Sequence, residues 1–182
     1  MSKVIAGINI TIDGYCDHTV MLPDEELHRY FTDVLNNAGV VLYGRITYQL
    51  MEAHWPALAK NPSGEKAMDD FALAIENIPK VVFSRTLKTT GWKNVTLAKK
   101  SLSEELEHIK QNQRKDILVG SPGLIAQLTN LKLIDEYHLS VHPVIAGKGL
   151  PLFKDMNDKN ILKLINSKTM GGTVTNFYEA IK

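Results

Sequence analysis

The sequence predicts a three-layer α/β fold with a mixed, mostly parallel sheet that ends in antiparallel strands. Short apolar strand segments alternate with amphipathic helical segments through the first two thirds of the chain, which is typical of a parallel sheet covered on both faces. The last third carries strand patterns with no helix between them, and this favours antiparallel closing strands. No repeat, low-complexity tract or charge block divides the chain, so we expect a single domain over residues 1–182.

The expected strands follow from apolar runs and from alternation. Residues 4–12 alternate in polarity and are rich in β-branched side chains, and Asp13 and Gly14 then form a turn pair. The other early strands are short apolar runs at residues 40–43, 80–83, 95–97 and 116–119. Three strands are expected in the last third, at residues 136–141, 161–167 and 173–181.

The expected helices follow from capping residues and apolar spacing. One helix starts at residues 23–26, where Asp24 suits the cap and the next two acids suit the helix dipole, and Gly39 is expected to end it. Residues 55–64 contain two prolines and are predicted to form a loop. Further helices are expected from Gly44 to Met51, over about 65–76, from Ser101, and after the turn at 120–123.

Composition narrows the class of function. The 21 basic and 20 acidic residues are interspersed, so we expect no nucleic-acid surface. No apolar stretch reaches the roughly 20 residues of a membrane span, and the N-terminal apolar run is expected to be a strand rather than a signal peptide. A single cysteine, Cys16, excludes an internal disulfide and indicates a cytoplasmic protein. One cysteine and six scattered histidines predict no metal site.

Three predicted strands end in residues suited to phosphate. Ligands of α/β sheets bind beyond the carboxyl ends of the strands, where helix N-termini present free N–H groups. Glycines allow close backbone approach there, and arginines offer a fork that binds phosphate. The candidate residues are Gly44, Arg45 and Thr47; Ser84, Arg85 and Thr86; and Gly120, Ser121, Pro122, Gly123 and Leu124.

Each group also has a simpler explanation. Arg45 is equally a solvated residue at a helix start, and residues 84–86 are equally an ordinary polar loop. The turn at 120–123 fits neither the G-x-G-x-x-G pattern nor the P-loop pattern. Three such strand ends in one small sheet nevertheless favour an anionic ligand.

The same motifs, in the same order, resemble the dihydrofolate-reductase-like family. The resemblance is to the branch that contains the reductase half, the C-terminal domain, of the bifunctional riboflavin-biosynthesis deaminase/reductase. The H-x-E and P-C-x-x-C signature of the deaminase half is absent from this chain. The stretch 142–153 is the most specific to this branch. The other matching segments are residues 12–14, 44–48, 82–85, 119–123 and 133–139.

The resemblance implies an NADPH-dependent reductase of a small pterin- or pyrimidine-like substrate that works as a homodimer. It implies that the turn at 120–123 holds the pyrophosphate and that the nicotinamide lies near Asn9 and residues 13–16. Two alternatives remain, an FMN-dependent relative and a non-catalytic module of the same fold that binds a dinucleotide or a flavin. The resemblance implies that the adenosine phosphates of NADPH are bound by Arg45, Thr47, Ser84 and Arg85.

No carboxylate is singled out as a proton donor. Asp13, at the end of the first strand, is the candidate, and a turn-forming Asp-Gly pair is the alternative. Three further residues are candidates for substrate contact, Cys16 through its thiol and Tyr48 and Trp55 by stacking. Ordinary packing is the alternative for all three.

Overall fold

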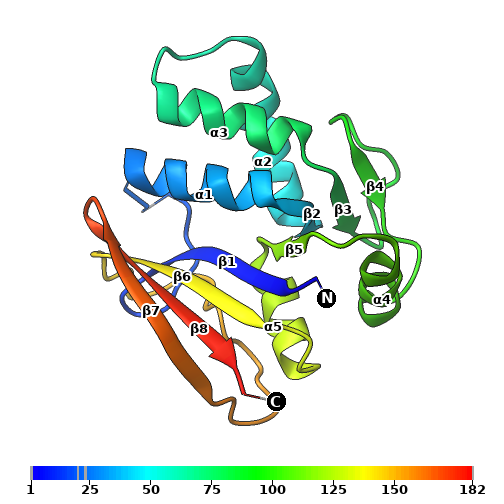
Figure 1. The fold of residues 1–182 in the computed structure, drawn as a ribbon, viewed down its shortest axis with the longest axis vertical. Coiled ribbons are helices and arrows are strands. Elements are labelled where there is room, and N and C mark those ends of the chain that lie inside the picture. Colours follow the sequence, from blue (N-terminus) through cyan, green and yellow to red (C-terminus); the bar gives the residue numbers. More distant parts are fainter. Residues whose placement is uncertain (1, 20, 23, 182) are drawn as a thin grey trace.

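The described strands form one sheet in the computed structural model, which covers residues 2–19, 21–22 and 24–181 (Figure 1). The strand order is β4-β3-β2-β5-β1-β6-β8-β7. The neighbours from β4 to β6 are parallel, whereas β8 runs antiparallel to β6 and β7 antiparallel to β8. The predicted mixed sheet with antiparallel closing strands is therefore confirmed.

The element bounds follow the predicted pattern closely. The strands are β1 (Val4–Thr11), β2 (Ala38–Gly44), β3 (Lys80–Phe83), β4 (Val95–Leu97), β5 (Asp116–Val119), β6 (Glu136–His142), β7 (Leu162–Met170) and β8 (Thr173–Ala180). The helices are α1 (Glu25–Asn37), α2 (Arg45–Lys60), α3 (Lys66–Asn77), α4 (Leu102–Asn112) and α5 (Pro122–Asn130).

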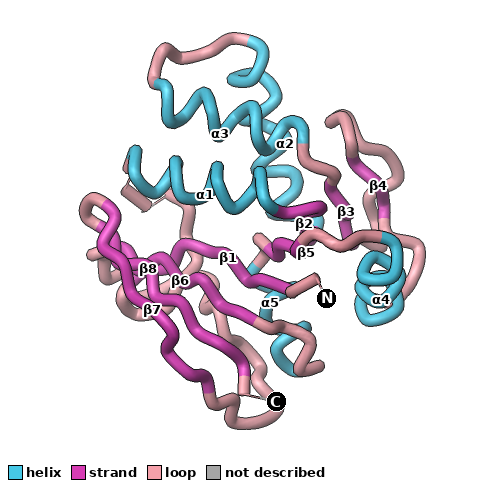
Figure 2. Tube along the Cα trace, viewed as in Figure 1, coloured by secondary structure: helices cyan, strands magenta, loops and turns pink. Residues whose placement is uncertain are grey.

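Helices cover both faces of the sheet, as Figure 2 shows. Helices α1, α2 and α3 pack on one face, and α4 and α5 pack on the other. Side chains of β1 alternate between these layers, because Val4 and Ala6 join the core under α4 and α5 whereas Ile5 joins the core under α1 to α3. The six parallel strands thus end at one edge, called here the carboxyl edge, at Thr11, Gly44, Phe83, Leu97, Val119 and His142.

Helix α1 begins as predicted but ends earlier. The Asp24 carboxylate accepts a hydrogen bond from the Leu27 N–H at 2.9 Å, so Asp24 is the N-cap, while Pro23 lies outside the described residues. The prediction that Gly39 ends the helix is wrong, since Gly39 belongs to β2. A Cβ at Gly39 would lie 1.8 Å from Oε1 of Gln113, so this glycine allows close packing against the end of α4.

Helix α2 continues through the segment predicted to be a loop. Residues 55–60 are helical, and Pro56 lies inside the helix. A proline there loses one backbone hydrogen bond, but tertiary packing outweighs that loss. The ring of Trp55 packs edge-on against Phe71 of α3, with centroids 4.6 Å apart, and this contact holds the last turns of α2 in place.

Candidate functional site

The structure brings the predicted phosphate-binding groups together at the carboxyl edge. Ser84 and Arg85 follow β3, Gly44 precedes α2 at the end of β2, and Gly120 follows β5. Strands β3, β2 and β5 are direct neighbours, so these groups lie side by side along the edge. Asn9 lies near the end of β1, the next strand along.

A hydrogen bond joins the starts of α2 and α5. The Gly44 N–H donates to Oγ of Ser121 at 2.9 Å, and Ser121 is buried. Ser121 therefore does not cap its own helix, and neither α2 nor α5 has a side-chain cap. By contrast, α1 is capped by Asp24 and α4 by a capping box that includes Ser101. The first turn of α2 thus offers backbone N–H groups to an anion, and α5 adds that of Gly123, because Pro122 has none and the Leu124 N–H donates to the Ser121 carbonyl.

The glycine turn before α5 combines an open position with a packed one. A Cβ at Gly123 would meet no atom within 4 Å, so its backbone faces open space. A Cβ at Gly120 would lie 3.0 Å from the Tyr43 ring, and close packing alone explains that glycine. Pro122 occupies the first turn of α5, and the side chain of Leu124 is buried in the core. Of these positions, Gly123 leaves the most room for a bound group.

The two arginines differ in how they are held. Arg45 is exposed and donates to Oε1 of Gln49 at 3.0 Å. Arg85 is exposed, and its guanidinium has no hydrogen bond or ion pair with another described residue. The Ser84 hydroxyl accepts from the backbone N–H groups of Thr86 and Leu87, which fixes the turn that carries Arg85. Thr47 is half-buried in the first turn of α2. Arg85 is thus the residue left free to bind a phosphate.

Asp13 does not fit the role of proton donor. Its carboxylate accepts hydrogen bonds from the Thr11 hydroxyl at 2.6 Å, from the Gly147 N–H at 2.7 Å and from the Ala146 N–H at 3.1 Å. These bonds, led by the one from Thr11, lower the pKa of Asp13 to about 2. The carboxylate is therefore ionised near neutral pH, and it fastens the loop after β6 to the end of β1.

Asp13→Asn should lower the melting temperature at pH 7 and leave turnover within about threefold, because the anchor weakens while no proton donor is lost. The exposed Asp17, which binds only its own turn through Thr19, supplies the matched control as Asp17→Asn. An unchanged melting temperature with a roughly 100-fold fall in kcat would instead restore Asp13 as the acid.

The other candidates for substrate contact are packed side chains. Cys16 packs against the core, and burial raises the pKa of its thiol to about 12, so it is not a reactive thiolate. Tyr48 is fully buried and its hydroxyl donates to Glu52, so its ring has no face open to a ligand. Trp55 lies in the aromatic contact with α3 described above. For all three residues the structure favours the packing alternative.

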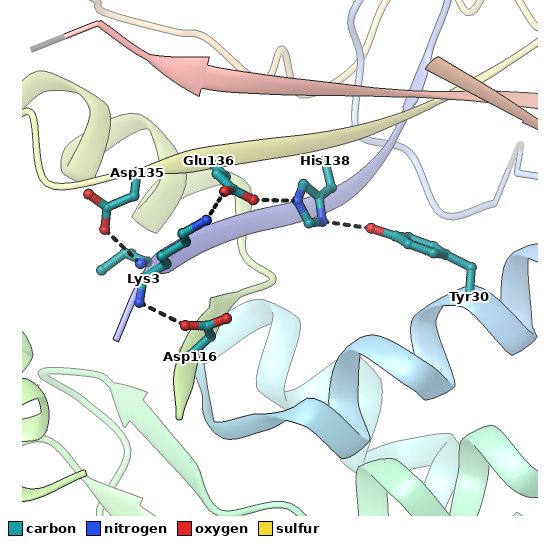
Figure 3. A network of polar contacts seen from close by, with 7 residues as sticks. Lys3, Tyr30, Asp116, Asp135, Glu136 and His138 are labelled. Atoms are coloured by element: carbon teal, nitrogen blue, oxygen red, sulfur yellow. Dashed lines mark hydrogen bonds and ion pairs between the residues drawn. The ribbon is translucent and has the colours of Figure 1, made fainter. Parts of the chain in front are cut away.

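A separate polar network lies at the opposite edge of the sheet, where the strands begin (Figure 3). The Tyr30 hydroxyl contacts Nδ1 of His138 at 2.6 Å, and Nε2 of His138 contacts Glu136 at 3.2 Å. Lys3 then binds the other oxygen of Glu136 at 2.5 Å. Burial lowers the pKa of His138, so a neutral ring accepts from Tyr30 and donates to Glu136. The side chains of Tyr30, His138, Glu136 and Lys3 are all paired within this network, so the network ties α1 to β6 and β1.

Two hollows of the structure lie away from the carboxyl edge. One, of about 190 Å³, lies beside the network under α1 and is lined by Ile5, Asp33, Val34, Asn37, Ala38, Asp116, Leu118 and His138. A second, of about 160 Å³, lies near Tyr137 and Phe153. Within the described ranges, no cluster of three or more histidine, cysteine or acidic residues is arranged to hold a metal, and no helix is long and apolar enough to cross a membrane.

Comparison with known proteins decides the family. The family model described as the RibD C-terminal domain matches residues 2–175. The chain belongs to this family. Among curated relatives, the uncharacterized protein YyaP of Bacillus subtilis (strain 168) is 33% identical over 180 residues, which cover 94% of this chain and 91% of YyaP. The uncharacterized protein YwjB of the same organism is 24% identical over 183 residues, with 97% of each chain covered.

Solved structures share the fold of this RibD C-terminal domain. A putative riboflavin biosynthesis protein from Shewanella sp. PV-4 superposes with a TM-score of 0.75 at 19% identity, and all of both chains is covered. A pyrimidine reductase-like protein from Corynebacterium diphtheriae gives 0.68 at 14% identity, with 100% of this chain and 92% of that chain covered. Acinetobacter baumannii RibD gives 0.72 at 15% identity, and this chain spans 58% of it. The resemblance to the riboflavin-reductase branch is thus confirmed.

One histidine at the carboxyl edge is not among the candidates that the sequence singled out. His142 ends β6 at the carboxyl edge, and both of its ring nitrogens are buried without a hydrogen-bond partner among the described residues. The same holds for Oδ1 of Asn9. The even spacing of His138 and His142 shows only that they share a face of a strand. The position of His142 at the end of a strand was the available signal.

Proposed function

We propose that this protein is an NADPH-dependent reductase of a small planar heterocycle of the pyrimidine or pterin type. The observation that carries the proposal is the pair of uncapped helix starts, α2 and α5, joined by the Gly44–Ser121 hydrogen bond beside the unpaired Arg85. Such a pair suits a pyrophosphate, and an arginine on the next strand suits the 2′-phosphate that distinguishes NADPH from NADH.

The residues present fit a dinucleotide lying along the carboxyl edge. The first-turn N–H groups of α2 and α5 would hold the pyrophosphate, with Gly123 giving it room. Ser84 and Arg85, which follow β3, would hold the adenosine phosphates. Arg45 and Thr47, in the first turn of α2 after the neighbouring strand β2, would hold them from the other side. These groups bind by charge, by backbone donation or through a hydroxyl, and none of the named side chains belongs to the buried core.

A stretch of β1 that lacks a strand partner on one side marks the place where the reacting ring would lie. Strand β5 pairs with β1 only as far as Ala6, whereas β1 continues along β6 to Thr11. Residues 7–11 of β1 therefore have no strand partner on the β5 side, and Asn9 borders this gap. When bound there, NADPH would supply the hydride, and the chain would orient the two rings and keep water from them.

The substrate class rests on the relatives. The Corynebacterium diphtheriae structure is named a pyrimidine reductase-like protein, and a Thermotoga maritima structure with a TM-score of 0.68 at 18% identity is named a deaminase and 5-amino-6-(5-phosphoribosylamino)uracil reductase. This chain spans 57% of the Thermotoga maritima protein. A pyrimidine ring is thus the first substrate to test, and a pterin ring the second.

Thermal shift and tryptophan fluorescence, with NADPH, NADH and FMN titrated separately, test the proposal. NADPH should raise the melting temperature most, because a ligand at about 100 times its Kd adds about 2.7 kcal/mol to the free energy of unfolding. A response to FMN alone would establish the flavin-dependent alternative. NADPH binding without oxidation by any pyrimidine or pterin would establish the non-catalytic module.

We also propose a homodimer formed through the edge strand β7. This strand is exposed along most of its length and carries Leu164 and Ile165 on the surface, with Ile161 just before it and Ile181 near it at the end of β8. An exposed apolar edge strand is suited to pairing with a second copy. Light scattering should give twice the 20.3 kDa of one chain, and a monomer mass would contradict the proposal.

A further inference from the structure

A strip of polar side chains lies on the face of the sheet that α1 covers. His138 points toward α1, because its ring contacts Tyr30 of that helix. Residues two and four further along β6 share this face, and so do their partners on the neighbouring strands. The strip consists of Asn9 and Thr11 of β1, Ser140 and His142 of β6, and Thr173 and Thr175 of β8.

Some side chains of the strip have hydrogen-bond partners and others have none. The hydroxyls of Ser140 and Thr175 bind each other at 2.8 Å, and the Thr11 hydroxyl donates to Asp13. By contrast, Oδ1 of Asn9 and both ring nitrogens of His142 are buried and have no partner within residues 2–19, 21–22 and 24–181. Buried polar atoms without partners are rare in folded proteins and carry a free-energy cost. Within the strip, the free-energy cost of burying unpartnered polar atoms therefore falls at the carboxyl edge. These atoms lie on or beside residues 7–11 of β1, the stretch without a strand partner on the β5 side, where the reacting rings are proposed to bind.

His142 is suited to forming hydrogen bonds with an uncharged substrate ring. Its exposed fraction is 1%, and burial lowers its pKa while Asp24, the charged group that acts on it from α1, opposes the shift only in part. A neutral imidazole has one N–H donor and one acceptor nitrogen. His142 and Oδ1 of Asn9 together thus offer one hydrogen-bond donor and two acceptors at the ends of the paired strands β6 and β1.

We propose that His142 and Asn9 recognise the hydrogen-bonding edge of the substrate ring and so determine substrate specificity. This inference rests on the proposed function, because it places the substrate ring over the ends of β1 and β6. A pyrimidine amide edge presents an N–H beside a carbonyl, so Oδ1 of Asn9 accepts from the N–H and the His142 N–H donates to the carbonyl. Binding must uncover these atoms, since they are closed to solvent in the free chain.

The test uses His142→Phe, which keeps the ring but removes both nitrogens. The probes are 5,6-diaminouracil and its 1,3-dimethyl form, which lacks the ring N–H groups, each titrated alone and with saturating NADPH. We expect the variant to bind 5,6-diaminouracil about 10–100-fold more weakly. It should bind the dimethyl form as weakly as wild type does, because the methyl group on the ring nitrogen holds the neighbouring carbonyl away from residue 142 in both proteins. Its Kd for NADPH should stay within about twofold, and its melting temperature should not fall, because no existing bond is lost.

His138→Phe is the matched control. It removes a partnered histidine from the same face of the same strand, so it should lower the melting temperature and leave the preference between the two probes unchanged. Equal binding of 5,6-diaminouracil by wild type and His142→Phe would overturn the inference, and so would a wild type that binds neither probe. A parallel loss for both probes would likewise overturn it. Failure of NADPH alone to bind the wild type would overturn the proposed function instead.

Discussion

Replacing Arg85 with alanine should weaken NADPH binding by about 10–100-fold and change NADH binding by less than about threefold. The guanidinium is exposed and unpaired among the described residues, at the end of a strand next to the helix start of α2. A fork bound to a phosphate contributes charge-assisted hydrogen bonds of about 1.5–3 kcal/mol, and NADH has no phosphate at that position. Calorimetric titration of both dinucleotides at one salt concentration measures the effect.

Two further variants separate the effect of the guanidinium fork from that of positive charge and from that of losing any exposed arginine. Arg85→Lys keeps the charge but loses the fork, so its affinity for NADPH should fall between those of wild type and alanine. Arg114 is also exposed but lies just before β5, at the opposite edge, and Arg114→Ala should leave both affinities unchanged. Equal weakening of NADPH and NADH by Arg85→Ala would remove the 2′-phosphate assignment.

The second large effect concerns pH. Burial lowers the pKa of both His138 and His142 below the usual value of about 6.5. A histidine of this kind binds its proton more readily when the chain is unfolded, so its contribution to stability is complete above about pH 6.5 and is lost as the pH falls below it. Each group contributes a slope of up to about 1.4 kcal/mol per pH unit, so the free energy of unfolding should fall steeply between about pH 6.5 and 5.

Denaturant unfolding at half-unit steps of pH measures this slope. His142→Phe should flatten it in part, because one of the three histidines with a pKa lowered by burial is removed and His28 and His138 remain. The carboxylates with lowered pKa values act only at lower pH, since their stabilising effect is lost below about pH 4. They are Asp13, Asp17, Asp69, Glu104 and Glu136. A free energy of unfolding that stays level from about pH 7 to 5 would show that neither histidine is held neutral by the fold.

Most of the fold could be predicted because its strands are either fully buried or clearly alternating. Residues 40–43 and 117–119 are apolar throughout, as is typical of strands between two helical layers, and both lie in strands. The end of α2 could not be predicted, because Pro56 indicates a loop and only the packing of Trp55 on Phe71 reverses it. Gly39 was misread for a similar reason, since its neighbour Gln113 is distant in sequence.

Some features of the candidate site could be predicted from the sequence and others could not. Topology alone brings Ser84, Gly44 and Gly120 to one edge, so a correct strand order is enough to group them. The ionised state of Asp13 depends on N–H groups at residues 146 and 147, which no local pattern connects to the first strand. The unpaired nitrogens of His142 are likewise visible only once every neighbour is placed. Chemistry that depends on partners distant in sequence is what sequence reasoning missed.

A crystal structure of the protein with bound NADPH tests the central claim most directly. We expect the pyrophosphate over the first turns of α2 and α5, the 2′-phosphate against Arg85 and the nicotinamide beside Asn9. A dinucleotide in the hollow beneath α1 that Asp33 and Asp116 line, at the opposite edge of the sheet, would contradict the proposed site.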